Sequence, residues 1–135
     1  LLSRRQRQMC IRDRRTARSL EAGWDAGHPQ IRQGCGYDHN WVLRGSGLRR
    51  AAVLAAPESG ITMTLSTTQP GLQVYTGNFL PETAGKGGVR YALRCGVALE
   101  AQGFPNAVNQ PVFPSAVLRA GERYQQEIIF AFGHD

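Results

Sequence analysis

The stretch AAVLAAPESGITMTLST (residues 51–67) decides the fold class. Two strand-like runs, 51–56 and 61–67, flank the segment PESG (57–60). In that segment proline presets its own backbone angle and glycine tolerates a positive φ, which suits a tight turn. The stretch therefore predicts two strands joined as a hairpin.

Similar short runs recur on both sides of this hairpin. From Trp41 onward they are separated by turn residues at roughly 8–12-residue spacing, which is typical of a sandwich or barrel, and helical periodicity is nearly absent. The further candidate strands are WVLR (41–44), LQVYT (72–76), VALEAQ (97–102) and YQQEIIFAF (124–132). A glycine-bearing loop is expected at 81–96, and an irregular connection at 104–115, where prolines would remove ladder hydrogen bonds. We expect an all-β protein.

The 135 residues, with 41% hydrophobic and 19% charged side chains, suffice for one domain with a core. The net charge of +6 lies entirely within the first 18 residues, which contain seven arginines and a single acidic residue, Asp13. Residues 1–14 show no apolar period and no cap or turn pattern, so we interpret them as a disordered arm or an artefact of sequence assembly. An arginine-rich, acid-poor segment also permits a mitochondrial transit peptide. The domain is expected to span 15–135.

Several classes of partner are disfavoured. The basic arm carries no interleaved aromatic residues to stack on bases, so nucleic-acid binding is not expected. No apolar run approaches the roughly 18 residues that a membrane span needs. The three cysteines (Cys10, Cys35 and Cys95) are far apart and form no CxxC, which favours neither a disulfide framework nor a zinc site. A reducing, cytoplasmic location fits this cysteine usage best.

Polar side chains on two of the predicted strands suggest chemistry. Glu100 lies in the middle of a mostly apolar strand, where the ordinary interpretation is a solvated outer face. On another strand Gln73 and Tyr75 share a face, and amide, carboxylate and aromatic groups together suit a sugar. Trp41 and Phe79 could add to the aromatic surface.

The segment GYDHN (36–40) contains a second carboxylate. In an extended chain Asp38 and His39 point to opposite faces, so they are not a catalytic dyad. Asp38 has two interpretations, a turn or cap organiser and a ligand-binding group, and the residues alone leave both open. Nothing in the spacing of His28 and His134 suggests metal ligation.

Four segments together resemble the aldose 1-epimerase family in order and spacing. They are GYDHNWVL (36–43), TTQPGLQVYTGNFL (67–80), VALEAQGFPNAVNQPVFPS (97–115) and VLRAGERY (117–124). The resemblance runs from about residue 15 to the end and implies the C-terminal part of a galactose mutarotase-like super-sandwich of antiparallel sheets. It also implies an isomerase that binds a small-molecule aldose and interconverts the α and β anomers of hexoses such as galactose and glucose, without metal or cofactor.

By this resemblance Glu100 is the general base that takes the proton from the C1 hydroxyl, and a glutamate carboxylate is a base at neutral pH without special tuning. Asp38 and Gln73 are implied to hold sugar hydroxyls, with Tyr75 and Asn78 as pocket neighbours. The family's general-acid histidine, a second histidine and an arginine come from the earlier half and have no counterpart here, so little activity is expected from this chain alone. The competing hypothesis is a non-catalytic carbohydrate-binding or regulatory β-sandwich module.

Overall fold

The computed structural model describes residues 17, 19–24 and 27–134. The arm predicted at residues 1–14 lies outside them. Two compact units can be distinguished: one contains the described residues up to Trp41 together with Gln73–Glu100, and the other contains Val42–Leu72 together with the residues from Ala101 onward.

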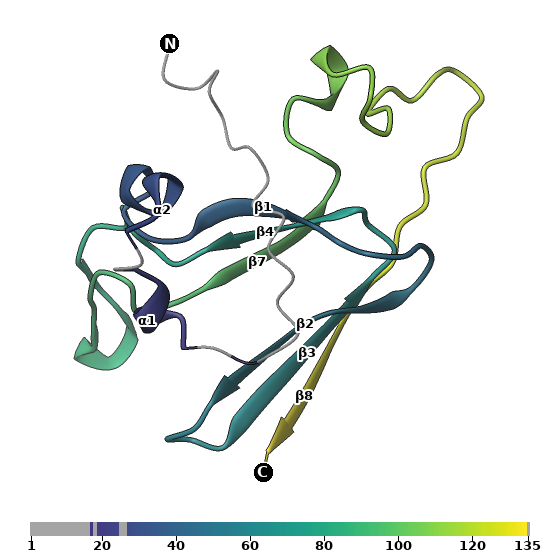
Figure 1. Cartoon of the computed structure of the whole chain (residues 1–135). Helices are drawn as coiled ribbons and strands as arrows, with labels where there is room; N and C mark the ends of the chain where they lie inside the picture. Colours follow the sequence, from purple (N-terminus) through teal and green to yellow (C-terminus); the bar gives the residue numbers. More distant parts are fainter. Residues whose placement is uncertain (1–16, 18, 25–26, 135) are drawn as a thin grey trace. The chain divides into compact units, whose positions relative to one another are not determined.

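Strands dominate the described residues, and the helices are short (Figure 1). The elements are α1 (Glu21–Trp24), α2 (Pro29–Gln33), β1 (Asp38–Val42), β2 (Arg49–Ala56), β3 (Ile61–Thr67), β4 (Gly71–Tyr75), β5 (Thr83–Ala84), η2 (Lys86–Gly88), β6 (Arg90–Tyr91), β7 (Ala98–Gln102), η3 (Ala107–Asn109) and β8 (Ile128–His134). All six predicted strands are present, and the all-β prediction is confirmed. None of the helices among the described residues is long and apolar enough to cross a membrane.

The strands form three sheets, with strand orders β1-β4-β7, β2-β3-β8 and β5-β6. The first sheet carries the polar side chains singled out from the sequence. Hydrogen bonds beyond both ends of the β1–β4 pair, from Thr76 N–H to Tyr37 C=O (3.0 Å) and from Leu43 N–H to Pro70 C=O (2.9 Å), indicate that these two strands run antiparallel.

The second sheet begins with the predicted hairpin. β2 and β3 pair antiparallel, with Ala56 opposite Ile61. The N–H groups of Ser59 and Gly60 both donate to the Ala56 carbonyl, at 3.1 and 2.9 Å. Gly60 has a φ of +69°, which a side chain would disfavour, so glycine is the residue that closes this turn.

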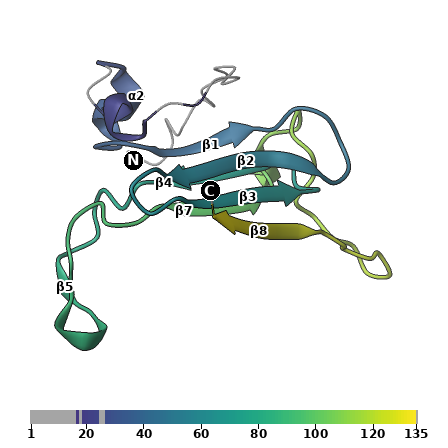
Figure 2. The same ribbon diagram turned by 90° about the horizontal axis from the view of Figure 1, so that it is seen from below.

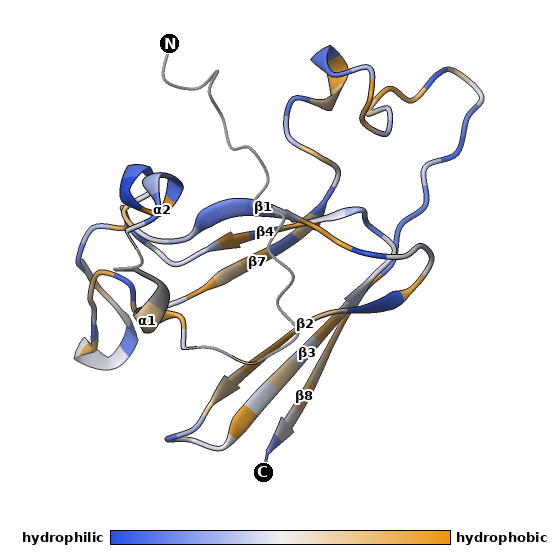
Figure 3. Cartoon of the chain, in the orientation of Figure 1, coloured by the Kyte–Doolittle hydropathy of each residue, from blue (hydrophilic) through white to orange (hydrophobic). Residues whose placement is uncertain are grey.

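The same sheet has two chemically different faces, because opposite residues of paired strands share a face. The apolar face carries Leu54, Ile61, Met63, Leu65, Phe130 and Phe132, and the other carries Val53, Thr62, Thr64, Ser66 and Ala131. The hydropathy colouring alternates along β3 accordingly (Figure 3). Leu65 is fully buried, whereas Ile61 and Phe132 at the other end of the face are 51% and 73% exposed. The apolar face is therefore buried at Leu65 but exposed at Ile61 and along β8.

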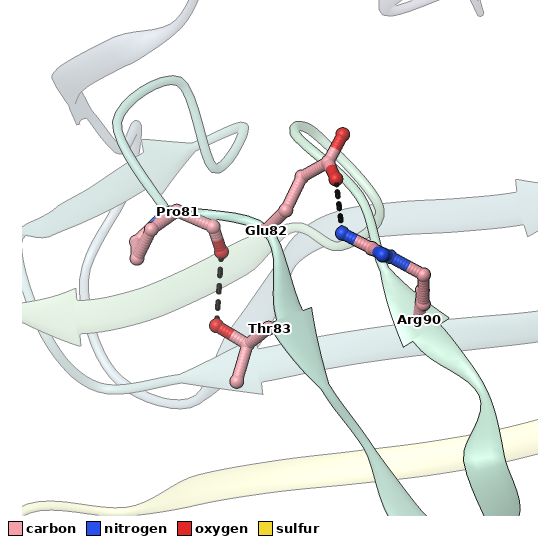
Figure 4. A network of polar contacts seen from close by, with 4 residues as sticks. All are labelled: Pro81, Glu82, Thr83 and Arg90. Carbon is pink, nitrogen blue, oxygen red and sulfur yellow. Dashed lines mark hydrogen bonds and ion pairs between the residues drawn. The ribbon is translucent and has the colours of Figure 1, made fainter.

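The stretch 81–96, expected to be a loop, contains the small hairpin β5–β6. Gly85 N–H donates to Val89 C=O at 2.6 Å, and a Cβ on Gly85 would lie 2.5 Å from the Tyr91 ring, so only glycine permits this close approach. Arg90 forms an ion pair with Glu82 at 2.8 Å (Figure 4). Both side chains are well exposed, so this pair contributes little to stability.

The connection 104–115 has no strand, as predicted, and includes only the short helix η3. Phe104 and Phe113 pack edge to face across it, with ring centroids 5.2 Å apart. Aromatic pairs of this geometry contribute about 0.5–1.5 kcal/mol beyond the area they bury. An irregular segment rich in proline is thus held by side-chain packing.

Candidate functional site

Asp38 and Gln73 lie together on the β1-β4-β7 sheet. Asp38 begins β1 and Gln73 is the central residue of β4, the neighbouring strand. The Gln73 amide Nε2 donates to the Asp38 carboxylate Oδ1 at 2.5 Å. Gln73 is only 7% exposed, and its carbonyl Oε1 is buried without a hydrogen-bond partner. The amide of Gln73 therefore keeps a buried acceptor that no described residue satisfies.

A further polar residue, Asn40, extends this pair. Asn40 is two residues beyond Asp38 on β1, and alternation places both side chains on the same face. Asn40 is 2% exposed, and neither Oδ1 nor Nδ2 has a hydrogen-bond partner. Sequence reasoning did not single it out, although the alternation within GYDHN would have placed it beside Asp38.

Asn78, which the resemblance implies is a pocket neighbour, uses both ends of its side-chain amide in hydrogen bonds within the chain. Its Nδ2 donates to the carbonyls of Gly34 and Tyr37, both at 2.8 Å, and its Oδ1 accepts from the Thr76 hydroxyl at 2.7 Å. The chain at Gly36 has a φ of +138°, and a Cβ there would lie 2.3 Å from Asn78 Oδ1. The two Nδ2 bonds hold the segment leading into β1, and the Thr76 bond joins Asn78 to the residue after β4, so Asn78 helps to fix the position of the strand that carries Asp38.

The aromatic residues near this sheet are partly engaged in local contacts. The Tyr75 hydroxyl accepts a hydrogen bond from the Phe79 N–H at 2.9 Å. The Phe79 side chain itself is 61% exposed. Trp41 packs against Tyr37 with ring centroids 6.5 Å apart. Phe79 is thus an aromatic surface available to a ligand in this part of the chain.

Glu100 lies on β7, which is next to β4 in the same sheet. It is the one exposed residue of a strand whose other residues are half-buried. Its carboxylate makes no hydrogen bond or ion pair with any residue that the structure describes. An unpartnered, accessible carboxylate can accept a proton directly from a bound molecule.

Of the described histidines, His28 and His39 make hydrogen bonds to nearby backbone groups, and His134 lies at the end of a strand. His28 caps α2, because its Nδ1 accepts from Gln30 N–H at 3.3 Å. His39 is 4% exposed, and its Nδ1 accepts from Asp38 N–H at 3.0 Å. His134 ends β8. Among residues 17, 19–24 and 27–134 no group of three or more histidine, cysteine or acidic side chains could hold a metal ion.

The β1-β4-β7 sheet thus carries the hydrogen-bonded pair Asp38–Gln73 and the carboxylate of Glu100, which has no partner among the described residues. Such sets suit ligands rich in hydroxyl groups, because carboxylates and amides accept and donate the hydrogen bonds that hydroxyls require. The described residues thus form an all-β protein with a candidate binding site for a hydroxyl-rich ligand on the β1-β4-β7 sheet.

Comparison with known proteins identifies the family. The family model described as aldose 1-epimerase matches residues 11–131. The chain belongs to the aldose 1-epimerase family.

Several relatives support this assignment. Galactose mutarotases from Bos taurus and Homo sapiens are each 46% identical over 99 residues, which is 72% of this chain and 29% of theirs. Aldose 1-epimerase from Haemophilus influenzae is 33% identical over 122 residues, 89% of this chain and 35% of its own length. The solved structure of a GalM/aldose epimerase homologue from C. elegans aligns with a TM-score of 0.66 at 31% identity and covers 73% of this chain and 30% of that one. The chain thus spans about a third of the length of its relatives, and its mutarotase-like fold is shown for that part.

Proposed function

We propose that this chain is the part of an aldose 1-epimerase that carries the catalytic base and two sugar-binding groups. The complete enzyme would interconvert the α and β anomers of hexoses such as galactose and glucose. The observation that carries the proposal is the free carboxylate of Glu100 on the strand next to the hydrogen-bonded Asp38–Gln73 pair. The matched relatives include proteins named galactose mutarotase and aldose 1-epimerase.

Each proposed role follows from the hydrogen-bonding state of the residue. Gln73 donates to Asp38 and keeps a free carbonyl oxygen, so it would accept a sugar hydroxyl without losing its own anchor. Asp38 retains its second carboxylate oxygen for another hydroxyl. Tyr75 and Asn78 would support the pocket indirectly, because Tyr75 holds the Phe79 backbone and Asn78 holds the segment before β1.

The proposed reaction begins when the Glu100 carboxylate removes the proton from the C1 hydroxyl. The C1 oxygen then forms the aldehyde carbonyl, the bond from C1 to the ring oxygen breaks, and the ring oxygen must receive a proton from an acid. After rotation about the bond between C1 and C2 the ring oxygen attacks the other face of C1, and the two protons return. We propose that the acid comes from a part of the complete enzyme that this chain does not match, since His28 and His39 serve other contacts and His134 lies at the end of β8, in the other sheet.

Polarimetry on freshly dissolved α-D-glucose tests the proposal. The protein would be a chimera in which this chain replaces the matching part of the Bos taurus galactose mutarotase. We expect mutarotation well above the spontaneous rate from the chimera and only the spontaneous rate from the 135-residue chain alone. A correctly folded chimera without activity would contradict the proposal.

A second candidate function is a non-catalytic sugar-binding module. It is favoured by the burial of His39 and its hydrogen bond to Asp38 N–H, which leave the described residues without an exposed histidine beside the Asp38–Gln73 pair. Calorimetric titration of the chain with galactose distinguishes the two. Binding by the chain, combined with an inactive chimera, would favour the module.

A further inference from the structure

His39 is a buried, titratable side chain that the proposed mechanism does not use. It is 4% exposed and lies on β1 between Asp38 and Asn40. Because side chains alternate along a strand, His39 and Asp38 lie on opposite faces of the sheet. On its own face the imidazole packs edge to face against Tyr37, with ring centroids 6.5 Å apart. His39 therefore lies on the side of β1 away from the Asp38 carboxylate.

The register of β1 and β4 shows that the backbone N–H of Asp38 does not bond to β4. The hydrogen bonds from Thr76 N–H to Tyr37 C=O and from Leu43 N–H to Pro70 C=O set this register. Hydrogen-bonded and non-hydrogen-bonded positions alternate in an antiparallel pair, so Asp38, one residue after Tyr37, directs its N–H away from β4. β1 lies at the margin of the sheet, and Figure 2 shows the short helix α2, not a strand, beside its start. Within the described residues no further strand lies beyond β1 to supply an acceptor.

The imidazole of His39 supplies this acceptor. Its Nδ1 accepts from the Asp38 N–H at 3.0 Å. A ring nitrogen that accepts a hydrogen bond carries no proton, so the neutral ring has its proton on Nε2. The same aspartate is also held through its side chain, because Gln73 Nε2 donates to the Asp38 carboxylate Oδ1. One hydrogen bond thus fixes the backbone of Asp38 and another fixes its carboxylate, from opposite faces of the sheet.

We infer that His39 is a positioning residue for Asp38. A binding group must be held to within about 0.5 Å and 10–20° of its productive geometry. The hydrogen bond from the Asp38 N–H to His39 restricts rotation of the peptide plane before Asp38, and it so limits the direction in which the aspartate side chain leaves the strand. This inference rests on the proposed function, because it takes Asp38 as a group that binds the sugar.

A positioning role and a packing role for His39 predict opposite outcomes for two substitutions. His39→Asn keeps an acceptor oxygen close to the place of Nδ1 but loses the volume of the ring. His39→Phe keeps a ring that packs against Tyr37 but has no acceptor. The positioning role predicts that the phenylalanine variant loses affinity for sugar and that the asparagine variant retains it. A side chain that only fills the core would give the reverse.

The test places both substitutions in the chimera with the Bos taurus galactose mutarotase. Calorimetry should give a Kd for galactose about fivefold higher in His39→Phe, the effect of losing one typical hydrogen bond, and a Kd within about twofold of the unsubstituted value in His39→Asn. The kcat from polarimetry should change little in either variant, because Glu100 is untouched. When Asp38→Ala is already present, His39→Phe should raise the Kd no further, since the carboxylate that it positions is gone. Circular dichroism checks that the variants are folded.

Nuclear magnetic resonance tests the hydrogen bond itself, without sugar and on the 135-residue chain. Two-bond correlations between the ring protons and nitrogens of His39 should identify Nδ1 as the unprotonated nitrogen. The Asp38 amide proton should exchange with solvent more slowly in the unsubstituted chain than in His39→Phe. These two signals respond to the anchoring of Asp38 and not to its role in binding.

Four outcomes would overturn the inference. They are a higher Kd for His39→Asn than for His39→Phe, an undiminished effect of His39→Phe in the Asp38→Ala background, a proton on Nδ1, and the absence of galactose binding by the unsubstituted chimera. A chimera that binds galactose with the expected differences but does not catalyse mutarotation would support the positioning role and contradict the proposed reaction. The two proposals can therefore fail separately.

Discussion

The two larger sheets of this chain place polar and apolar side chains in opposite ways. The β1-β4-β7 sheet buries His39, Asn40 and Gln73, while the β2-β3-β8 sheet exposes Phe130 and Phe132. Burial of polar groups without full hydrogen bonding costs free energy, and so does exposure of large apolar groups. Such unfavourable placements can persist where a bound ligand supplies the missing hydrogen bonds or a partner covers the apolar side chains. The first sheet thus carries the buried polar groups of the candidate site, and the second carries exposed apolar side chains.

The largest expected effect tests the first sheet as a catalytic surface. In the chimera, Glu100→Gln should lower the mutarotation rate by about 10²–10⁴-fold, the usual contribution of a general base, because the amide cannot accept the C1 proton. Sugar binding should persist, since the substitution keeps the shape of the side chain. Polarimetry gives the rate and calorimetry the affinity. Glu122→Gln, an exposed carboxylate outside this sheet, is the matched control. Full activity in Glu100→Gln would exclude Glu100 as the base.

The next effect concerns Leu65, the fully buried residue of the apolar face. Leu65→Ala should lower the free energy of unfolding by about 2–5 kcal/mol, because Leu65 is 0% exposed and its truncation leaves a cavity. Val53→Ala, at a residue 56% exposed on the other face, should change it by no more than about 0.5 kcal/mol. Urea denaturation followed by circular dichroism measures both. Equal values for the two variants would show that the sheet has no packed core in solution.

The smallest effect distinguishes two buried asparagines of the first unit. Asn40→Leu should raise the free energy of unfolding by about 1 kcal/mol in the absence of sugar, because the asparagine has no hydrogen-bond partner to lose. Asn78→Leu should lower it, since three hydrogen bonds are removed. The same urea titration reports both changes. A destabilised Asn40→Leu would mean that Asn40 is already satisfied in solution.

The sequence predicted the strands best where the side-chain pattern was regular. The bounds of ITMTLST match those of β3, because alternating apolar and polar residues specify one face for the core. β1 was expected at 41–44 but spans Asp38–Val42, since polar residues that resemble a turn are buried there by tertiary contacts. β8 starts at Ile128 and not at Tyr124, because Tyr124 and Gln126 bond through their side chains to Gln69 and Thr68. The short helices α1 and α2 have too few residues to show a helical period.

The sequence predicted which residues belong to the candidate site, but it did not predict the hydrogen bonds between them. Alternation placed Gln73 and Tyr75 on one face, yet the hydrogen bond between Asp38 and Gln73 joins residues 35 positions apart. Such a contact depends on strand order, which the sequence does not encode locally. The hydrogen bonds of Asn78 likewise reach back to Gly34 and Tyr37, so its anchoring role emerged only with the fold.

The order in which the second sheet can form follows from its connectivity. The hairpin of β2 and β3 needs only the four-residue turn 57–60, whereas the hydrogen bonds that bring Thr67 to the start of β8 span 60 residues. Closing a loop of that length is slow compared with forming a hairpin, because the loop loses conformational entropy before any stabilising contact forms. During synthesis the hairpin would therefore stand with the β8 side of β3 unpaired until residues 128–134 have left the ribosome, and aggregation through this unpaired side is favoured during that interval.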